Sequence, residues 1–270
     1  FGITATILVA ELIGAWWTNS LSLLADAGHM LTDAAGLLMA LIAANLALRP
    51  PTPERTWGWR RSEVLAAGAQ AAVLLGVGVY AFAEGVRRLA TPPEVTAGGL
   101  LVFGIVGLVG NIVSMLVLSS GRGANLNMRA AFLEVVNDAL GSVAVIVSAV
   151  VIALTGWTRI DALAGMLIAT LIVPRAITIL REAGSILLES TPPGLNLEEV
   201  RRHILEVPHV VGVHDLHASL VATGVPVLTA HVVVDDECFL DGHAPRVLDA
   251  LQACVAQHFP VAIDHATFQL

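Results

Sequence analysis

The stretch Val95–Gly121, VTAGGLLVFGIVGLVGNIVSMLVLSSG, contains 27 residues and no charged side chain. A helix needs about 20 mostly apolar residues to cross the hydrocarbon core of a bilayer, and this stretch is longer than that. Two further stretches, Val64–Phe82 and Ala139–Thr158, are free of charge over 19 and 20 residues. These three runs predict a polytopic membrane protein made of helices.

The same pattern predicts six transmembrane helices before residue 190. Charged residues make up 13% of the 270 residues, which is about half their share in a soluble domain, and 56% of the residues are hydrophobic. The predicted helices cover residues 1–17, 21–48, 62–89, 97–119, 128–154 and 160–187.

The last 80 residues differ in composition from the rest of the chain. Residues 191–270 hold ten acidic residues, three arginines and eight of the nine histidines. We therefore expect a transmembrane domain at 1–188, a linker at 189–195 and a cytoplasmic domain at 196–270. The linker contains two prolines and a glycine, which favour a stiff turn.

The pattern of the C-terminal domain predicts a small α+β fold with the order α-β-β-α-β. Because a domain of this size is marginally stable alone, dimerisation through it would add stability. The predicted elements are helices at 197–206 and 245–258 and strands at 210–220, 227–234 and 262–270.

Arginines in the short loops predict the orientation in the membrane. Three arginines lie in the loops on one side, whereas six lie on the other, namely Arg49, Arg55, Arg60, Arg61, Arg122 and Arg129. The side with six is expected to face the cytoplasm of an inner or plasma membrane, together with both termini. The two cysteines fit that reducing compartment. A net charge of −8 without a basic cluster argues against nucleic acid as a partner, so none is expected.

Two pairs of ionisable residues lie inside predicted transmembrane helices, where such groups are costly and mark functional sites. His29 and Asp33 share the second helix, and Glu134 and Asp138 share the fifth. A spacing of four residues places each pair on one helical face. One imidazole and three carboxylates suffice for a tetrahedral divalent cation. The alternative is that each pair makes only a polar contact between helices, which two matching pairs disfavour.

Other polar residues in these helices are expected to serve packing. Asp26 lies on the second helix, and we expect it to make a packing contact or to support a metal ligand. Asn111 and Asn137 are expected to make hydrogen bonds between helices. Gly104, Gly107 and Gly110 are expected to let helices approach closely.

Three motifs resemble the cation diffusion facilitator family. The stretch NSLSLLADAGHMLTD (19–33) resembles its second-helix signature, and AAFLEVVNDALGS (130–142) resembles its fifth-helix signature. TWGWRRSE (56–63) is similar to its entry to the third helix. The resemblance extends over essentially the whole chain. It implies a homodimer of six-helix subunits with ferredoxin-like cytoplasmic domains, which exports divalent metal, usually Zn²⁺, in exchange for protons.

The resemblance places the transport site on His29, Asp33, Glu134 and Asp138. Zinc-transporting members usually have histidine where this chain has Glu134. A carboxylate favours harder ions such as Mn²⁺ or Fe²⁺, whereas the imidazole of His29 favours zinc. We therefore expect Zn²⁺ as the substrate and keep Mn²⁺, Fe²⁺, Co²⁺ and Cd²⁺ as alternatives. The loop between the second and third helices has no histidine, so no metal site is expected there.

The resemblance also implies a metal site in the cytoplasmic domain, formed by His214, His231 and His265. His217 and Asp264 are possible additional ligands, and Asp235, Cys238 or water are further alternatives. The remaining histidines, His203, His209, His243 and His258, are interpreted as ordinary surface residues. Metal at this site is expected to draw the two tails of a dimer together and raise transport.

Three other function classes remain as alternatives. An intramembrane metalloenzyme would need a motif such as His-Glu-x-x-His, which the sequence lacks, so we expect a transporter and no enzyme. A passive channel would conduct metal without dependence on a proton gradient. A metal sensor would need only the tail and would leave the two membrane pairs unexplained.

Overall fold

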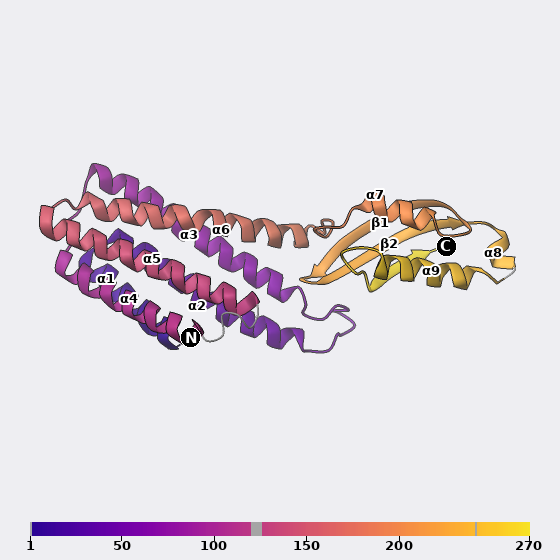
Figure 1. The fold of residues 1–270 in the computed structure, drawn as a ribbon, viewed down its shortest axis with the longest axis horizontal. Helices are drawn as coiled ribbons and strands as arrows, with labels where there is room; N and C mark the ends of the chain where they lie inside the picture. The colour runs from indigo at the N-terminus through magenta and orange to yellow at the C-terminus, as the bar shows by residue number, and fades with distance from the viewer. Residues whose placement is uncertain (1, 120–125, 241) are drawn as a thin grey trace. The chain divides into compact units, whose positions relative to one another are not determined.

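The structure is a computed structural model, and it describes residues 2–119, 126–240 and 242–270 (Figure 1). Its first part consists of long helices: α1 (Gly2–Thr18), α2 (Leu21–Ala47), α3 (Ser62–Ala90), α4 (Ala97–Ser119), α5 (Leu126–Thr155) and α6 (Arg159–Leu187). The second part continues with α7 (Leu197–Leu205), β1 (Val210–Ala222), β2 (Val225–Val234), α8 (Glu237–Leu240), α9 (Ala244–Gln257) and β3 (His265–Gln269).

The predicted fold class is confirmed, and the six long helices begin and end within two residues of the predicted positions. Among the described residues, α2 to α6 each contain a segment long and apolar enough to cross a membrane. The helix α1 is shorter, with 17 residues. The helices form here because uninterrupted apolar side chains can face lipid while the backbone satisfies its own hydrogen bonds.

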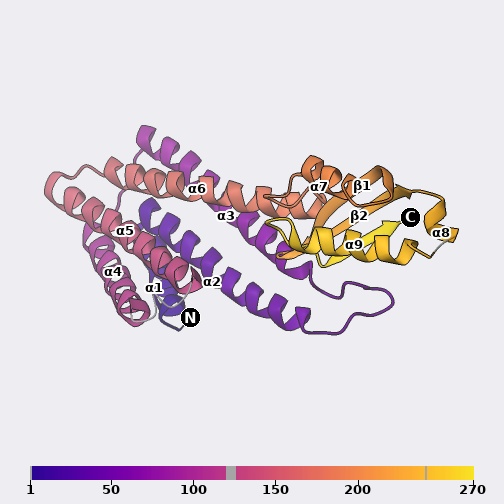
Figure 2. The same ribbon diagram turned by 45° about the vertical axis from the view of Figure 1, so that its right-hand side comes forward.

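The chain divides into two compact units, which we describe separately. The first comprises Phe1–Leu41 and Ala67–Leu180, and the second comprises Ile42–Ala66 and Arg181–Leu270. Within the first unit, α4 packs against both α1 and α5 (Figures 1 and 2). Glycines make this approach possible. A Cβ atom at Gly107 would lie 2.7 Å from Glu11 Oε1 of α1 and 3.0 Å from Ser142 Oγ of α5.

The N-terminus of α2 is held by Asp161, a buried residue in the first turn of α6. Asp161 Oδ2 accepts a hydrogen bond from the backbone N–H of Leu21 at 2.6 Å. Asp161 Oδ1 accepts hydrogen bonds from the hydroxyls of Ser20 and Ser22 at 2.5 and 2.6 Å. The first N–H groups of a helix lack partners within the helix, and a carboxylate there also complements the helix dipole. Asp161 therefore fixes the start of the helix that carries His29 and Asp33.

The C-terminal domain is a three-stranded sheet with helices packed on it. The strand order is β1-β2-β3, with β1 and β2 antiparallel and β2 and β3 parallel. The helix α7 packs against β1 and α9, and α9 packs against β3. Fully buried side chains between these layers include Val200, Ile204, Leu228, Leu251, Val255 and Ile263.

Two details of the C-terminal domain differ from the predicted elements. The short helix α8 lies between β2 and α9, where the sequence pattern indicated no element. The last strand covers only His265–Gln269 and not 262–270, because Ile263 leaves the ladder and enters the core. The predicted α+β arrangement is otherwise present.

Candidate metal sites

The first cluster lies in the first unit and joins α2 to α5. His29 Nδ1 lies 3.6 Å from Asp33 Oδ2, and His29 Nε2 lies 3.6 Å from Asp138 Oδ1. One possible ligand atom from each residue lies within 4.8 Å of the other two. Ligand atoms about 2.0 Å from a tetrahedral zinc are about 3.3 Å apart. The two 3.6 Å distances start from different nitrogens of the His29 ring, so binding of one ion would also require this ring or a carboxylate to turn.

The side chains of this cluster are almost shielded from solvent. The exposed fractions are 9% for His29, 15% for Asp33 and 9% for Asp138. Two carboxylates in such a place repel each other unless a cation lies between them. The structure thus brings together three of the four residues expected at the transport site. Glu134 belongs to α5, one turn before Asp138, and its side chain lies outside the described residues.

Two more acidic residues are buried near this cluster. Glu11 of α1 and Asp26 of α2 are 1% and 2% exposed. Among the residues that the structure describes, Glu11 Oε2 and Asp26 Oδ2 have no hydrogen-bond partner. The sequence offered one signal for Glu11, because it is the only charged residue of the apolar stretch Phe1–Trp17. A buried carboxylate without a partner is costly unless a proton or a cation neutralises it.

The amides expected to join helices have different roles. Asn111 of α4 donates a hydrogen bond from Nδ2 to Ser142 Oγ of α5 at 3.3 Å. Asn137 of α5 is exposed and lines a cavity of about 320 Å³. The same cavity is lined by Asp26, His29 and Arg175, and otherwise mainly by apolar side chains. The imidazole of His29 thus lines a cavity that has a few polar groups in a mainly apolar wall.

The second cluster lies on the cytoplasmic domain, in the second unit. His214 and His231 face each other across β1 and β2, with ring centroids 5.0 Å apart. Asp215 Oδ2 lies 3.2 Å from His214 Nδ1 and 3.4 Å from His231 Nδ1. All three are exposed, and the two histidines line a cavity of about 340 Å³ with Asp236 and Gln269.

Asp215 is a ligand candidate that sequence reasoning missed. Neighbouring residues of a regular strand point to opposite faces of the sheet, so a regular strand would not let His214 and Asp215 share one metal site. Here the register shifts between His214 and His217, and Asp215 has a φ of +49°. This irregularity turns the Asp215 carboxylate toward the two imidazoles. The sequence gives no local signal for such a bulge.

The expected membership of His265 in this cluster is corrected by the strand register. In the parallel ladder, Val227 lies opposite His265, whereas Gln269 lies opposite His231. Four residues separate these positions, or about 13 Å along a strand. The His265 ring instead makes an edge-to-face contact with Trp57, with centroids 5.3 Å apart.

The other proposed additional ligands also lie elsewhere in the described structure. His217 pairs with Thr229 in the ladder, and Asp264 lines a different cavity with Asp249. Cys238 is 1% exposed and belongs to the hydrophobic core. Asp235 lies 3.5 Å from His209 and not at the His214 cluster.

In the loop between α2 and α3, the Arg55 guanidinium stacks on Trp59 at 3.8 Å.

Comparison with known families agrees with this architecture. Residues 1–188 match the model of the cation efflux transmembrane domain, and residues 192–270 match the model of the cation efflux protein cytoplasmic domain. The chain belongs to the cation diffusion facilitator family. It is therefore a family member with several apolar helices, which is the build of an integral membrane protein.

Relatives in this family align over nearly the whole chain. The metal cation efflux system protein CzcD of Cupriavidus metallidurans is 40% identical over 267 residues, which cover 99% of this chain and 83% of that protein. The zinc transporter ZitB of Escherichia coli is 39% identical over 272 residues, covering 100% and 85%. The cadmium, cobalt and zinc/H(+)-K(+) antiporter of Bacillus subtilis is 38% identical over 232 residues, covering 85% and 75%.

Among the solved structures that match is one of a C-terminal domain. It is the metal-bound C-terminal domain of the CzcD transporter from Cuprividus metallidurans, with 36% sequence identity. The match covers 28% of this chain and 96% of that chain, with a TM-score of 0.25.

Proposed function

We propose that this protein exports a divalent metal cation, with Zn²⁺ as the main substrate, in exchange for protons. The observation that carries the proposal is the shielded cluster of His29, Asp33 and Asp138 between α2 and α5. The printed names of relatives, a zinc transporter and a cadmium, cobalt and zinc/H(+)-K(+) antiporter, support the same substrate class.

The exchange follows from the chemistry of the ligands. Imidazole and carboxylate must lose their protons to bind a metal, so metal and protons compete for the same atoms. The cluster binds metal from the cytoplasm with the imidazole of His29 in its neutral form, since a protonated ring nitrogen cannot act as a ligand. When helix movement opens the cluster outward, protons displace the metal. Metal affinity therefore falls as the outside pH falls, and an inward proton gradient drives export.

The remaining features of the proposal concern topology and assembly. We propose a homodimer in an inner or plasma membrane, with both termini in the cytoplasm. The transmembrane domain covers residues 1–188, the linker 189–195 and the cytoplasmic domain 196–270. The protein acts as a secondary transporter and not as an enzyme. The match to a cytoplasmic domain of the efflux family supports this organisation.

Transport into proteoliposomes tests this function. Zn²⁺ uptake is measured with a pH gradient, without one, and after an ionophore collapses it. We expect uptake that depends on the gradient. Uptake that follows the zinc gradient alone would support a passive channel, and the absence of Zn²⁺ and Mn²⁺ uptake would contradict the proposal.

Glu134 provides a test of metal preference. The substitution Glu134→His replaces a hard oxygen ligand by a borderline nitrogen ligand, so the ratio of Zn²⁺ to Mn²⁺ uptake is expected to rise on the order of tenfold. Initial uptake rates for both ions measure the ratio. Glu134→Gln removes the charge without adding imidazole and is expected to slow both ions. An unchanged ratio in Glu134→His would mean that Glu134 does not bind the ion.

The cytoplasmic cluster provides a test of regulation. We propose that metal bound by His214, Asp215 and His231 neutralises part of the acidic tail, draws the paired tails together and raises the transport rate. The double variant His214→Ala/His231→Ala is expected to lose the rise in rate that zinc on the cytoplasmic side produces. The variant His217→Ala, changed on the same strand, should keep it. A rise that survives in the double variant would refute this regulatory role.

A further inference from the structure

One buried carboxylate of the long helices has no role in the metal cluster. Glu11 lies in the middle of α1, its exposed fraction is 1%, and its Oε2 has no hydrogen-bond partner among the described residues. It does not belong to the group of His29, Asp33 and Asp138, whose ligand atoms lie within 4.8 Å of one another. Neither a hydrogen-bond donor nor the proposed metal therefore accounts for the burial of this acid.

The side chain of Glu11 occupies a place that a glycine of α4 leaves open. A Cβ atom at Gly107 would lie 2.7 Å from Glu11 Oε1 and 3.0 Å from Ser142 Oγ of α5. The Ser142 hydroxyl oxygen accepts a hydrogen bond from Asn111 Nδ2 of α4 at 3.3 Å. The carboxyl group thus lies where α1, α4 and α5 meet.

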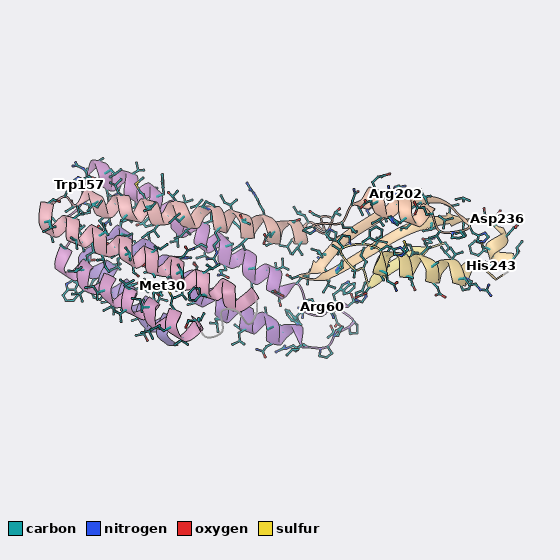
Figure 3. All side chains as sticks on the ribbon, viewed as in Figure 1. Met30, Arg60, Trp157, Arg202, Asp236 and His243 are labelled. Atoms are coloured by element: carbon teal, nitrogen blue, oxygen red, sulfur yellow. The ribbon has the colours of Figure 1, made fainter. Side chains whose placement is uncertain are left out.

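Apolar contacts close this place on both sides along α1. The Ile7 side chain lies against Gly110 one turn before Glu11, and Gly14 lies against the Phe103 ring about one turn after it. Met30 of α2, labelled in Figure 3, belongs to the same buried cluster as Ile7. These contacts keep water from the carboxyl group. An ionised carboxylate there would lose its solvation without a hydrogen bond in return, which is costly.

The charged groups that face Glu11 repel a further negative charge. They are Asp26 of α2 and Asp138 of α5, whereas α4 contributes no charged residue. Asp26 is also buried, but it lines the cavity of about 320 Å³ together with His29 and Arg175, and Glu11 does not. Burial and repulsion together favour a neutral, protonated Glu11 when no metal is bound.

We propose that Glu11 is a proton-binding site of the transport cycle, which holds a proton while the metal cluster is empty and releases it when the cluster takes up a divalent cation. Two positive charges beside Asp138 remove the repulsion and favour the ionised form of Glu11. In this step the O–H bond of the carboxylic acid breaks, the electron pair stays on the carboxylate, and the proton passes to water. By linkage, protonation of Glu11 weakens metal binding in return.

This inference rests on the proposed exchange of metal for protons, and it adds a proton that no metal ligand carries. The test counts the protons that the full chain in detergent releases for each bound ion. The background variant His214→Ala/His231→Ala removes the cytoplasmic cluster, and calorimetric titration with Zn²⁺ in buffers of different ionisation enthalpy gives the count.

The variant Glu11→Gln keeps the size of the side chain but cannot ionise. In the background it should still bind Zn²⁺ and should release fewer protons, with a decrease of at most about one, because one carboxyl group supplies one proton. An unchanged count would refute the proton-binding role. Loss of all Zn²⁺ binding by folded Glu11→Gln would mean that Glu11 is a metal ligand, which would also overturn the proposal.

Matched variants separate proton binding from a packing role. Glu11→Asp keeps an acid at this position and should restore the released proton, whereas a side chain that serves only packing would leave the count the same in Glu11→Asp and Glu11→Gln. Glu94→Gln changes an exposed carboxylate in the loop before α4 and should keep the count of the background.

Infrared difference spectra keep the proposal testable if Glu11→Gln does not fold. Addition of Zn²⁺ to the background should remove the C=O stretching band of a protonated carboxylic acid, and Glu11→Asp should shift that band. A spectrum without this band, or a band that Glu11→Asp leaves unmoved, would overturn the proposal. If the background binds no Zn²⁺, the proposed function fails together with this inference, whereas an unchanged proton count with intact Zn²⁺ binding contradicts this inference alone.

Discussion

Replacing Asp138 by alanine is expected to abolish metal transport, with a decrease of more than about 100-fold in the initial rate. Asp138 Oδ1 lies 3.6 Å from His29 Nε2, and it is the only residue of α5 that the described part of the structure places in the cluster. Its loss leaves His29 and Asp33 on α2 alone, so the ion no longer connects the two helices. Uptake of Zn²⁺ by proteoliposomes under a pH gradient measures the effect.

Two control variants make this result specific. Asp138→Asn keeps the shape of the side chain and removes its charge, and it should also lose most transport. Glu94→Ala changes an exposed carboxylate in the loop before α4 and should transport at the rate of the unchanged protein. Transport that persists in Asp138→Ala would mean that the cluster between α2 and α5 is not the transport site.

Asp161 is not one of the proposed metal ligands. Replacing it by alanine is nevertheless expected to destabilise the bundle of long helices and to impair transport. The substitution leaves two backbone N–H groups and two hydroxyls at the start of α2 without their acceptor. Hydrogen bonds to a charged group contribute about 1.5–3 kcal/mol each in favourable cases, so a loss on the order of 4 kcal/mol is expected. Because α2 carries His29 and Asp33, a shift of its start also displaces both ligands.

Thermal unfolding in detergent and Zn²⁺ uptake measure the two consequences of Asp161→Ala together. The unfolding temperature should fall by several degrees, and transport should fall with it. Glu182→Ala removes an exposed carboxylate from the same helix and should change neither quantity. Asp161→Asn should give an intermediate effect, because its amide keeps one acceptor oxygen. An unchanged unfolding temperature in Asp161→Ala would contradict the capping role.

The sequence predicted the features that depend on local pattern. Long, mainly apolar runs bounded by charged residues and turns predict membrane helices, and the six long helices lie within two residues of their predicted positions. The spacing of His29 and Asp33 likewise fixes a shared face on α2. The coarse order of the C-terminal domain followed from short alternating strands and an amphipathic helix.

Features that depend on distant partners were not predictable in the same way. The hydrogen bond from the Leu21 N–H to Asp161 joins residues 140 positions apart, and no local sequence pattern predicts it. The position of His265 depends on the register between β2 and β3. In the observed register, His265 lies four residues along the strand from the position opposite His231. Asp215 joins its cluster only because of a local shift in the β1 ladder. In each case the missing information is a pairing between segments.

The solvent exposure of the two clusters has a consequence for timing. His214, Asp215 and His231 have side chains that are 46–63% exposed, so an ion bound there as proposed would enter and leave by diffusion, without rearrangement of the chain. Occupancy of that proposed site would then follow the free metal concentration without waiting for a conformational change. His29, Asp33 and Asp138 are largely enclosed, so exchange at the proposed transport site would require collective helix movement on the scale of microseconds to milliseconds. If both clusters act as proposed, the C-terminal cluster would therefore respond to a rise in metal concentration before the membrane cluster completes one transport cycle.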